Sequence, residues 1–289
     1  MKSVVLAAMT GALLLTAGCQ KKVRSLSDVG EAEAEMAGTD ETAASLDVAA
    51  IESVDELPRE IIVDEAYLKA EATFDEAVFS KAPAIGMDLV EDAQIRIEAM
   101  SQDAQDYREA DPDYFRAYGL RIKWSVVAEA GNIMSLEGFF YTFTGGAHGN
   151  YFTDARIYNS ATGEPMRLSA FFQQPQAAVQ AHMDAVWQGI ARQKLRKGGR
   201  ASDIEQFHSQ ARELVSADMV LAGEVNFVPS TVPGKFGGYV VHFAPYDIGS
   251  YAEGAYHVTV PQAAFRDNLK QQYLALFDGE PVAVERLGD

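Results

Sequence analysis

One glycine-rich segment, residues 144–150 (TGGAHGN), places an imidazole between two strand-like stretches. Three glycines in five residues allow positive φ angles or the close approach of another part of the chain. His148 in such a turn is suited to act as a catalytic or ligand-binding imidazole. It is equally suited to hydrogen-bond across the turn and fix its shape. Gly145, Gly146 and His148 are therefore candidate binding residues.

A second segment, residues 246–254 (YDIGSYAEG), is a tyrosine-rich loop that follows a strand-like stretch. Each tyrosine offers a broad apolar ring and one polar hydroxyl, which suits contact with a protein or a glycan. The same residues also suit a structural plug at a corner of the fold. Tyr246, Tyr251 and the following Tyr256 complete the set of candidate binding residues.

Other catalytic and metal-binding signatures are absent from the sequence, which contains no G-x-S-x-G, H-E-x-x-H, P-loop or G-x-G-x-x-G motif in a suitable context. The five histidines are His148, His182, His208, His242 and His257. None lies four residues from another, so no helical metal-binding pair is expected. We expect His182 and His208 at the surface or boundary of helices. His242 and His257 lie in strand-like segments and could meet in space, but a histidine that is hydrogen-bonded within a sheet is expected more often than a ligand-binding one. No cofactor and no metal site is predicted.

A basic cluster lies between two expected helices and consists of Arg192, Lys194, Arg196, Lys197 and Arg200. It has two interpretations. It is an anion-binding patch, or it is a set of cations that interact favourably with the C-terminus of a helix ending at Gly198.

The composition limits the class of protein. The chain has 289 residues, 24 Lys+Arg against 42 Asp+Glu, a formal net charge of −18 and 48% hydrophobic residues. These values exclude a wholly disordered chain, a collagen and a polytopic membrane protein. The excess of negative charge argues against nucleic acid as a partner, because phosphate binding requires Lys and Arg.

The N-terminus predicts export and lipidation. Lys2 and an apolar run before residue 16 are typical of a signal peptide over residues 1–18. Residues 15–19 (LTAGC) resemble a bacterial lipobox, which implies diacylglycerol attachment at Cys19 and further acylation, for example with palmitate. Such a protein is held on a membrane by its acyl chains. Because Gln20 rather than Asp follows the cysteine, we expect an outer-membrane lipoprotein that faces the periplasm.

Residues 19–65 are expected to form a disordered acidic linker. Residues 31–60 contain ten acids and one base, a composition that disfavours burial. The linker either lifts the folded part from the membrane or captures a cationic partner.

The remaining sequence predicts an α+β fold with antiparallel sheet and several helices. Strands are expected at 67–74, 118–128, 133–143, 151–158, 226–228, 239–243 and 256–260, on the basis of alternation and composition. Helices are expected from Pro83 to about Met100, over 179–190 and 204–215, and from Pro261 to about Leu276.

Several short motifs resemble a known family. The GGAH turn, residues 162–164 (TGE) and residues 168–172 (LSAFF) are similar to the domain (DUF4163) shared by the RsiV anti-sigma factor and the N-terminal part of the PdaC peptidoglycan deacetylase. Residues 243–254 (FAPYDIGSYAEG) and 258–261 (VTVP) resemble the companion DUF3298 domain. The resemblance implies a DUF4163-like region at 66–172 and a DUF3298-like region at 173–289.

The resemblance implies binding rather than catalysis. In the deacetylase, catalysis belongs to an appended domain marked by a T-F-D-D-G stretch, which these 289 residues lack. In the anti-sigma factor, this domain binds lysozyme. We therefore expect a non-enzymatic, lipid-anchored envelope protein that recognises a lysozyme-like protein or peptidoglycan. The alternative is an envelope glycan-modifying enzyme that uses His148 and a carboxylate from the 246–254 loop.

Overall fold

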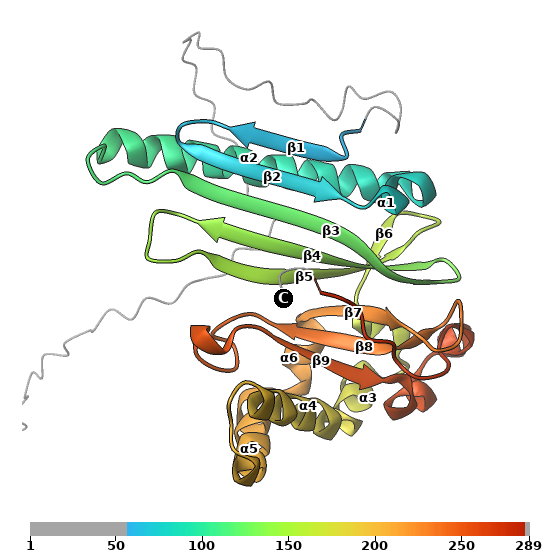
Figure 1. Cartoon of the computed structure of the whole chain (residues 1–289). Coiled ribbons are helices and arrows are strands. Elements are labelled where there is room, and N and C mark those ends of the chain that lie inside the picture. The colour runs from blue at the N-terminus through green and yellow to red at the C-terminus, as the bar shows by residue number, and fades with distance from the viewer. Residues whose placement is uncertain (1–56, 287–289) are drawn as a thin grey trace, which may run out of the picture. The chain divides into compact units, whose positions relative to one another are not determined.

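The computed structural model describes residues 57–286, which contain two β-sheets and a set of helices (Figure 1). The predicted signal peptide, Cys19 and most of the predicted linker lie outside the described residues. Among residues 57–286, no helix combines the length and apolar character needed to span a bilayer.

The larger sheet has six strands in the order β1-β2-β3-β4-β5-β6. Their bounds are β1 Glu60–Asp64, β2 Leu68–Phe74, β3 Tyr118–Ala130, β4 Ile133–Phe143, β5 Asn150–Asn159 and β6 Glu164–Met166. The fold class α+β is confirmed. The expectation of a disordered linker up to residue 65 is wrong at its end, because β1 pairs with β2 along its full length.

The pairing of β2 with β3 is parallel, whereas the sequence predicts antiparallel sheet. The reason is the connection between them, which consists of α1 (Glu76–Lys81) and α2 (Pro83–Ala110). A helical crossover of this length returns the chain to the end of the sheet from which β2 began, as parallel pairing requires. The other neighbouring strands of this sheet pair antiparallel.

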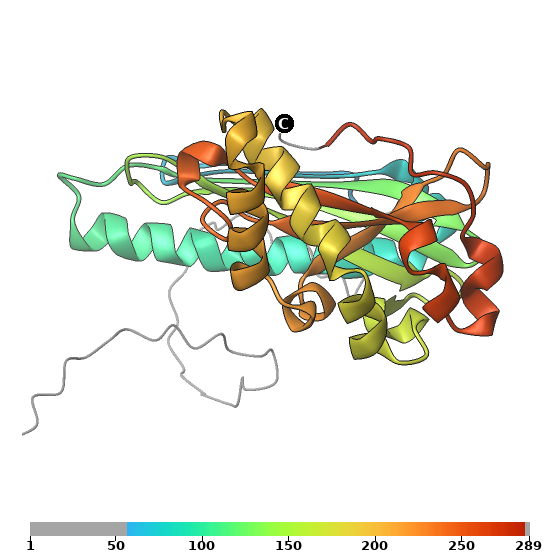
Figure 2. The same cartoon turned by 90° about the horizontal axis from the view of Figure 1, so that it is seen from below.

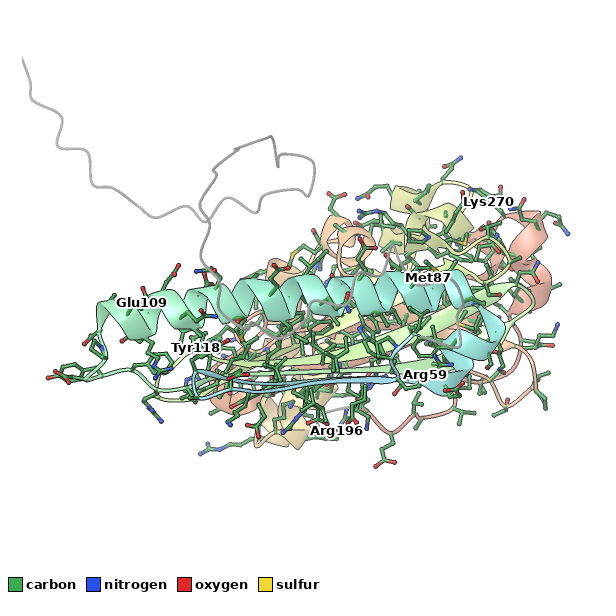
Figure 3. All side chains as sticks on the ribbon, turned by 90° about the horizontal axis from the view of Figure 1, so that it is seen from above. Arg59, Met87, Glu109, Tyr118, Arg196 and Lys270 are labelled. Atoms are coloured by element: carbon green, nitrogen blue, oxygen red, sulfur yellow. The ribbon has the colours of Figure 1, made fainter. Side chains whose placement is uncertain are left out.

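Helix α2 covers one face of the larger sheet (Figure 3). Pro83 occupies its first turn, and Ile85, Leu89 and Ala93 follow at a spacing of four residues on its buried side. These side chains pack against the inward residues of β2, β3 and β4, among them Trp124 and Phe140. This face of the sheet is therefore closed, and the opposite face remains available for polar and aromatic side chains.

The smaller sheet has three antiparallel strands, β7 Glu224–Pro229, β8 Phe236–Phe243 and β9 Tyr256–Pro261. Ser135 on β4 donates a hydrogen bond to the carbonyl of Phe227 on β7, at 2.9 Å, and so joins the two sheets. All eight residues of the central strand β8 are buried, which shows that both of its faces are covered.

Four helices pack beside the smaller sheet (Figure 2). They are α3 Pro175–Ala181, α4 Met183–Arg196, α5 Ile204–Leu214 and α6 Ala217–Ala222, with the 3₁₀ helices η3 Leu168–Phe171 and η4 Ala201–Asp203 beside them. Their buried residues form one core with the smaller sheet and with the near ends of β3, β4 and β5.

The last helix predicted from the sequence is wrong. The segment after Pro261 forms three 3₁₀ helices, η6 Gln262–Ala264, η7 Arg266–Asn268 and η8 Gln271–Leu276. Leu269 and Lys270 between them are extended, and this allows Phe265, Leu269 and Phe277 to enter the same core. Tertiary packing therefore overrides the helical spacing of these apolar residues.

We predict that Gly138→Ala destabilises the protein by about 1–3 kcal/mol. A Cβ at Gly138 would lie 2.8 Å from three ring atoms of the buried Trp124. The matched control is Gly119→Ala in the neighbouring strand, where the nearest atom would be 3.6 Å away, an ordinary contact. Urea unfolding of both variants checks this, and equal midpoints would contradict it.

Candidate functional site

The two segments selected from the sequence meet in the structure. The first connects β4 to β5, and the second connects β8 to β9 through the 3₁₀ helix η5 Tyr251–Glu253. The Tyr251 ring stacks on the His148 ring, with centroids 4.1 Å apart and an interplanar angle of 25°. The Tyr251 hydroxyl donates to the carbonyl of Gly149 at 2.6 Å. Residues about one hundred positions apart therefore form one site.

Two further tyrosines extend this contact. Tyr246 lies 5.5 Å from Tyr251 between ring centroids, and Tyr151 lies 6.2 Å from Tyr251 in an edge-to-face arrangement. The Tyr151 hydroxyl accepts a hydrogen bond from the backbone N–H of Ala255 at 3.2 Å. We call His148, Tyr151, Tyr246 and Tyr251 the tyrosine–histidine cluster.

The glycines of the first segment give the turn its shape. Gly145 has φ +84°, a conformation that glycine adopts without strain. Arg116 donates to the carbonyls of Gly145 and Gly146 at 3.2 and 3.0 Å. A Cβ at Gly149 would lie 2.3 Å from the Tyr141 ring, so this position has room only for glycine. Gly145 and Gly149 therefore give the turn that presents His148 its shape, whereas a Cβ at Gly146 would meet only the carbonyl of His148 at 4.0 Å.

His148 has a structural role in this turn. Its Nδ1 donates to the carbonyl of Gly149 at 2.9 Å, while its ring supports Tyr251. The residue is nevertheless exposed. The structural interpretation of His148 therefore has direct support, and its exposed ring remains available for contact.

Glu253 holds the second segment together. Its carboxylate accepts from the Ser250 backbone N–H at 3.0 Å and from the Tyr256 hydroxyl at 2.6 Å. Lys194 on α4 pairs with it at 3.1 Å. The hydrogen bond from Tyr256, with those from Ser250 and Lys194, lowers the pKa of Glu253 to about 2. The carboxylate is therefore ionised at neutral pH and stabilises the loop.

The prediction that Tyr256 contacts a ligand is wrong. Its side chain is fully buried, and its hydroxyl is directed to Glu253 rather than to the surface. By contrast, Tyr246 is 62% exposed and has φ +79°, a conformation that non-glycine residues rarely adopt. Tyr246 and Tyr251 therefore remain the candidate contact residues of this loop.

The sequence prediction omits Tyr141 and Tyr151. These residues are register partners on β4 and β5, so they flank the glycine turn symmetrically and lie on the same face of the sheet. Phe139 lies two residues before Tyr141, and its ring centroid is 6.0 Å from that of Tyr151. The aromatic residues that alternate along the sequence before and after the turn could have indicated that Tyr141 and Tyr151 lie beside it.

The two carboxylates of the tyrosine-rich loop are both engaged in local bonds. Asp247 accepts from the backbone N–H of Ala244 at 2.7 Å, and Glu253 is bonded as described above. Within residues 57–286, no group of three or more His, Cys, Asp or Glu is arranged to hold a metal ion.

A buried histidine pair lies on the smaller sheet. His242 and His257 meet, with 2.8 Å between their Nδ1 atoms. His242 Nε2 bonds to Asn226 Oδ1 at 2.7 Å and lies 3.9 Å from the buried carboxylate of Glu137. Burial lowers the pKa of His257 to about 3 and holds that of His242 well below its usual value.

The expectation that His182 lies at a surface or boundary is wrong. His182 follows α3 directly, is only 4% exposed, and its Nε2 hydrogen-bonds with the Tyr239 hydroxyl at 2.5 Å. Burial lowers its pKa to about 4. His208, as expected, lies nearer the surface and contacts Asp184 at 2.9 Å.

Comparison with known proteins identifies one family over part of the chain. Residues 65–151 match the family model described as "Deacetylase PdaC". This range runs from β2 to the start of β5, so it includes His148 and its turn. The match confirms the resemblance to this family that the sequence motifs predict. No curated protein shows significant sequence similarity to the chain.

Two solved structures of DUF3298 family proteins are similar. One, from Bacteroides fragilis, has 17% identity and a TM-score of 0.46, and the match covers 72% of this chain and 86% of that chain. The other, from Pseudomonas aeruginosa PAO1, has 15% identity and a TM-score of 0.44, with 79% and 100% covered.

We predict that the stability of the protein falls as the pH decreases from about 6.5 to about 4. In this window the unfolded chain binds protons at its histidines, whereas the buried His182 does not until its lowered pKa of about 4 is reached. The contribution of His182 to the free energy of unfolding is complete above pH 6.5 and amounts to roughly 3 kcal/mol at most. Urea unfolding between pH 7 and 4.5 should show a shallower pH dependence for His182→Gln than for the wild type. Parallel curves would contradict this account.

Proposed function

We propose that this chain is a cell-envelope binding protein, anchored by lipid at Cys19 to the outer membrane and facing the periplasm. It binds peptidoglycan glycan strands through the tyrosine–histidine cluster and has no catalysis of its own. The observation that supports this proposal is the meeting of His148 and Tyr251 at an exposed turn, with Tyr246 beside them.

The chemistry of the cluster favours a sugar ligand. A sugar ring has an apolar face that stacks on an aromatic ring and hydroxyl groups that bond to polar tips. Tyr246 presents an exposed ring in a strained backbone conformation, and such conformations persist where the surrounding structure and function require them. Several rings fixed at one surface offer contact without a large loss of side-chain entropy on binding.

The same geometry supports binding over catalysis. The matching family bears the name of a deacetylase, but the T-F-D-D-G stretch linked to deacetylation is not found in the 289 residues. The alternative of a glycan-modifying enzyme needs a carboxylate that acts with His148. Asp247 and Glu253 are the acids of the tyrosine-rich loop, and both already accept hydrogen bonds from the loop or from residues beside it.

A lysozyme-like protein is the second candidate ligand. The net charge of −18 favours fast encounter with a basic protein at low salt. This attraction is screened by salt, whereas stacking on a glycan is not. The ionic-strength dependence of binding therefore separates the two ligands.

We predict that Tyr246→Ala and Tyr251→Ala each weaken binding to purified peptidoglycan sacculi by about two- to tenfold, because each removes one stacking ring. Cosedimentation with sacculi at increasing protein concentration gives the affinities. A parallel pull-down on immobilised basic lysozyme, at low and high salt, tests the second ligand.

Two controls make this test specific. Tyr246→Phe keeps the ring and should retain most of the affinity. Ile62→Ala changes a side chain that is 64% exposed on β1 and should have no effect. Binding to neither sacculi nor lysozyme, or equal loss in the Ile62→Ala variant, would contradict the proposal.

We predict that Cys19→Ser abolishes labelling by palmitate and moves the protein from the membrane fraction to the soluble fraction of the envelope. The thioether-linked diacylglycerol requires the cysteine sulfur, and several acyl chains contribute about 0.8 kcal/mol per buried CH₂ to membrane binding. Labelling that is unchanged in the variant would exclude lipidation at this residue.

A further inference from the structure

A cavity of about 350 Å³ lies at the C-terminal end of α4. It borders the tyrosine–histidine cluster, because the backbone N–H of its wall residue Ala255 bonds to Tyr151, but no member of the cluster lines it. Its walls are mainly cationic and polar, and they consist of Gln193, Arg196, Lys197, Ala255, His257 and Arg286. Arg196 lies on the side of the sheets opposite to α2 (Figure 3). Two residues of the basic cluster noted in the sequence, Arg196 and Lys197, therefore line this cavity.

The cations of this cavity come from two distant parts of the chain. Arg196 and Lys197 belong to the end of α4, and Arg286 belongs to the C-terminal segment. That segment is fixed upstream, where the backbone N–H of Glu280 donates to Thr231 Oγ1 at 3.0 Å and that of Val282 donates to the carbonyl of Pro229 at 2.9 Å. Arg286 is thus brought to α4 by defined contacts.

The cations of the cavity keep N–H donors that their neighbours in the fold do not use. Arg286 pairs through Nη1 with the buried Glu137 at 2.5 Å, and a guanidinium has five N–H donors. Lys197 donates to the carbonyl of Glu253 at 2.6 Å, which does not neutralise its charge. Among residues 57–286, no acidic side chain pairs with Arg196 or Lys197. In a protein with a net charge of −18, this is a local excess of positive charge.

His257 adds a hydrogen-bond acceptor to the wall. Asn226 Oδ1 and Glu137 Oε2 both face His242 Nε2, at 2.7 and 3.9 Å, so this nitrogen carries the proton. His242 Nδ1 then accepts from His257 Nδ1 at 2.8 Å, which leaves Nε2 of His257 as the acceptor. Burial, and after it the positive charges of Arg286 and Lys197, lower the pKa of His257 and favour the same neutral form.

The helix macrodipole explains only part of this arrangement. Cations in the last turn of a helix are favoured by its partial negative charge, which accounts for Arg196 and Lys197. It does not account for Arg286, which another segment supplies, or for the hollow between them.

We infer that this cavity is a binding site for a small ligand that carries a carboxylate or phosphate group. Arg196, Lys197 and Arg286 contact the oxyanion by charge-assisted hydrogen bonds, and His257 accepts a hydrogen bond from a hydroxyl group of the same ligand. The inference does not depend on glycan binding by the tyrosine–histidine cluster, and its test uses probes without a sugar ring.

The test titrates the full chain with three probes, lactate, inorganic phosphate and uncharged lactamide, followed by NMR chemical shifts of Arg196 and His257. At least one of the two anions should shift these signals saturably, and lactamide should not. Saturation by lactate alone assigns a carboxylate ligand, and saturation by phosphate alone assigns a phosphate ligand. Absence of a shift with both anions overturns the inference.

Two variants of α4 locate the site. Arg196→Ala removes a cavity cation and should weaken anion binding about tenfold, as expected for one charge-assisted contact. Arg192→Ala removes the same charge one turn earlier, where the side chain bonds to Gln188 outside the cavity, and should change the affinity less than twofold. Equal weakening by both variants shows unspecific attraction and overturns the inference.

Discussion

The contact between Tyr251 and the turn before β5 is the interaction on which the candidate binding surface depends. The ring of Tyr251 stacks on His148, and its hydroxyl bonds to Gly149. His148 and Gly149 lie within the residues that match the PdaC family model. Tyr251 lies in the connection between β8 and β9, two strands of the smaller sheet. The surface therefore forms only when both sheets are folded, and Glu253 supports it by fixing the loop that carries Tyr251.

Much of the fold could be predicted from the sequence, because a strand or helix with one buried face carries apolar residues at a regular spacing. The strands before and after Gly131 and the helix that begins at Pro83 are clear examples. Strand β1 was not predictable, since its residues Glu60–Asp64 continue an acidic stretch and gain stability only by pairing with β2. The parallel pairing of β2 and β3 depends on how α1 and α2 cross the sheet between them. No short sequence pattern predicts the path of such a connection.

The candidate site could be predicted only in part. Glycine spacing around His148 indicates a turn, and this property is local. The burial of Tyr256 is not local, because it depends on packing against the core beneath β8 and β9. The Tyr256 hydroxyl donates a hydrogen bond to Glu253. Glu253 also forms an ion pair with Lys194 on α4, which lies more than fifty residues earlier in the chain. Similarly, the cationic cavity requires Arg286 to reach α4, which only the folded chain reveals.

The central claim is that the protein works by contact through the surface where His148 meets Tyr251. The most direct measurement is an NMR titration of the aromatic side chains with soluble peptidoglycan fragments. The account predicts that the ring signals of His148, Tyr246 and Tyr251 shift together and saturate at one affinity, while the ring signals of the buried Tyr239 stay unchanged. Saturable shifts confined to residues outside the tyrosine–histidine cluster would contradict it.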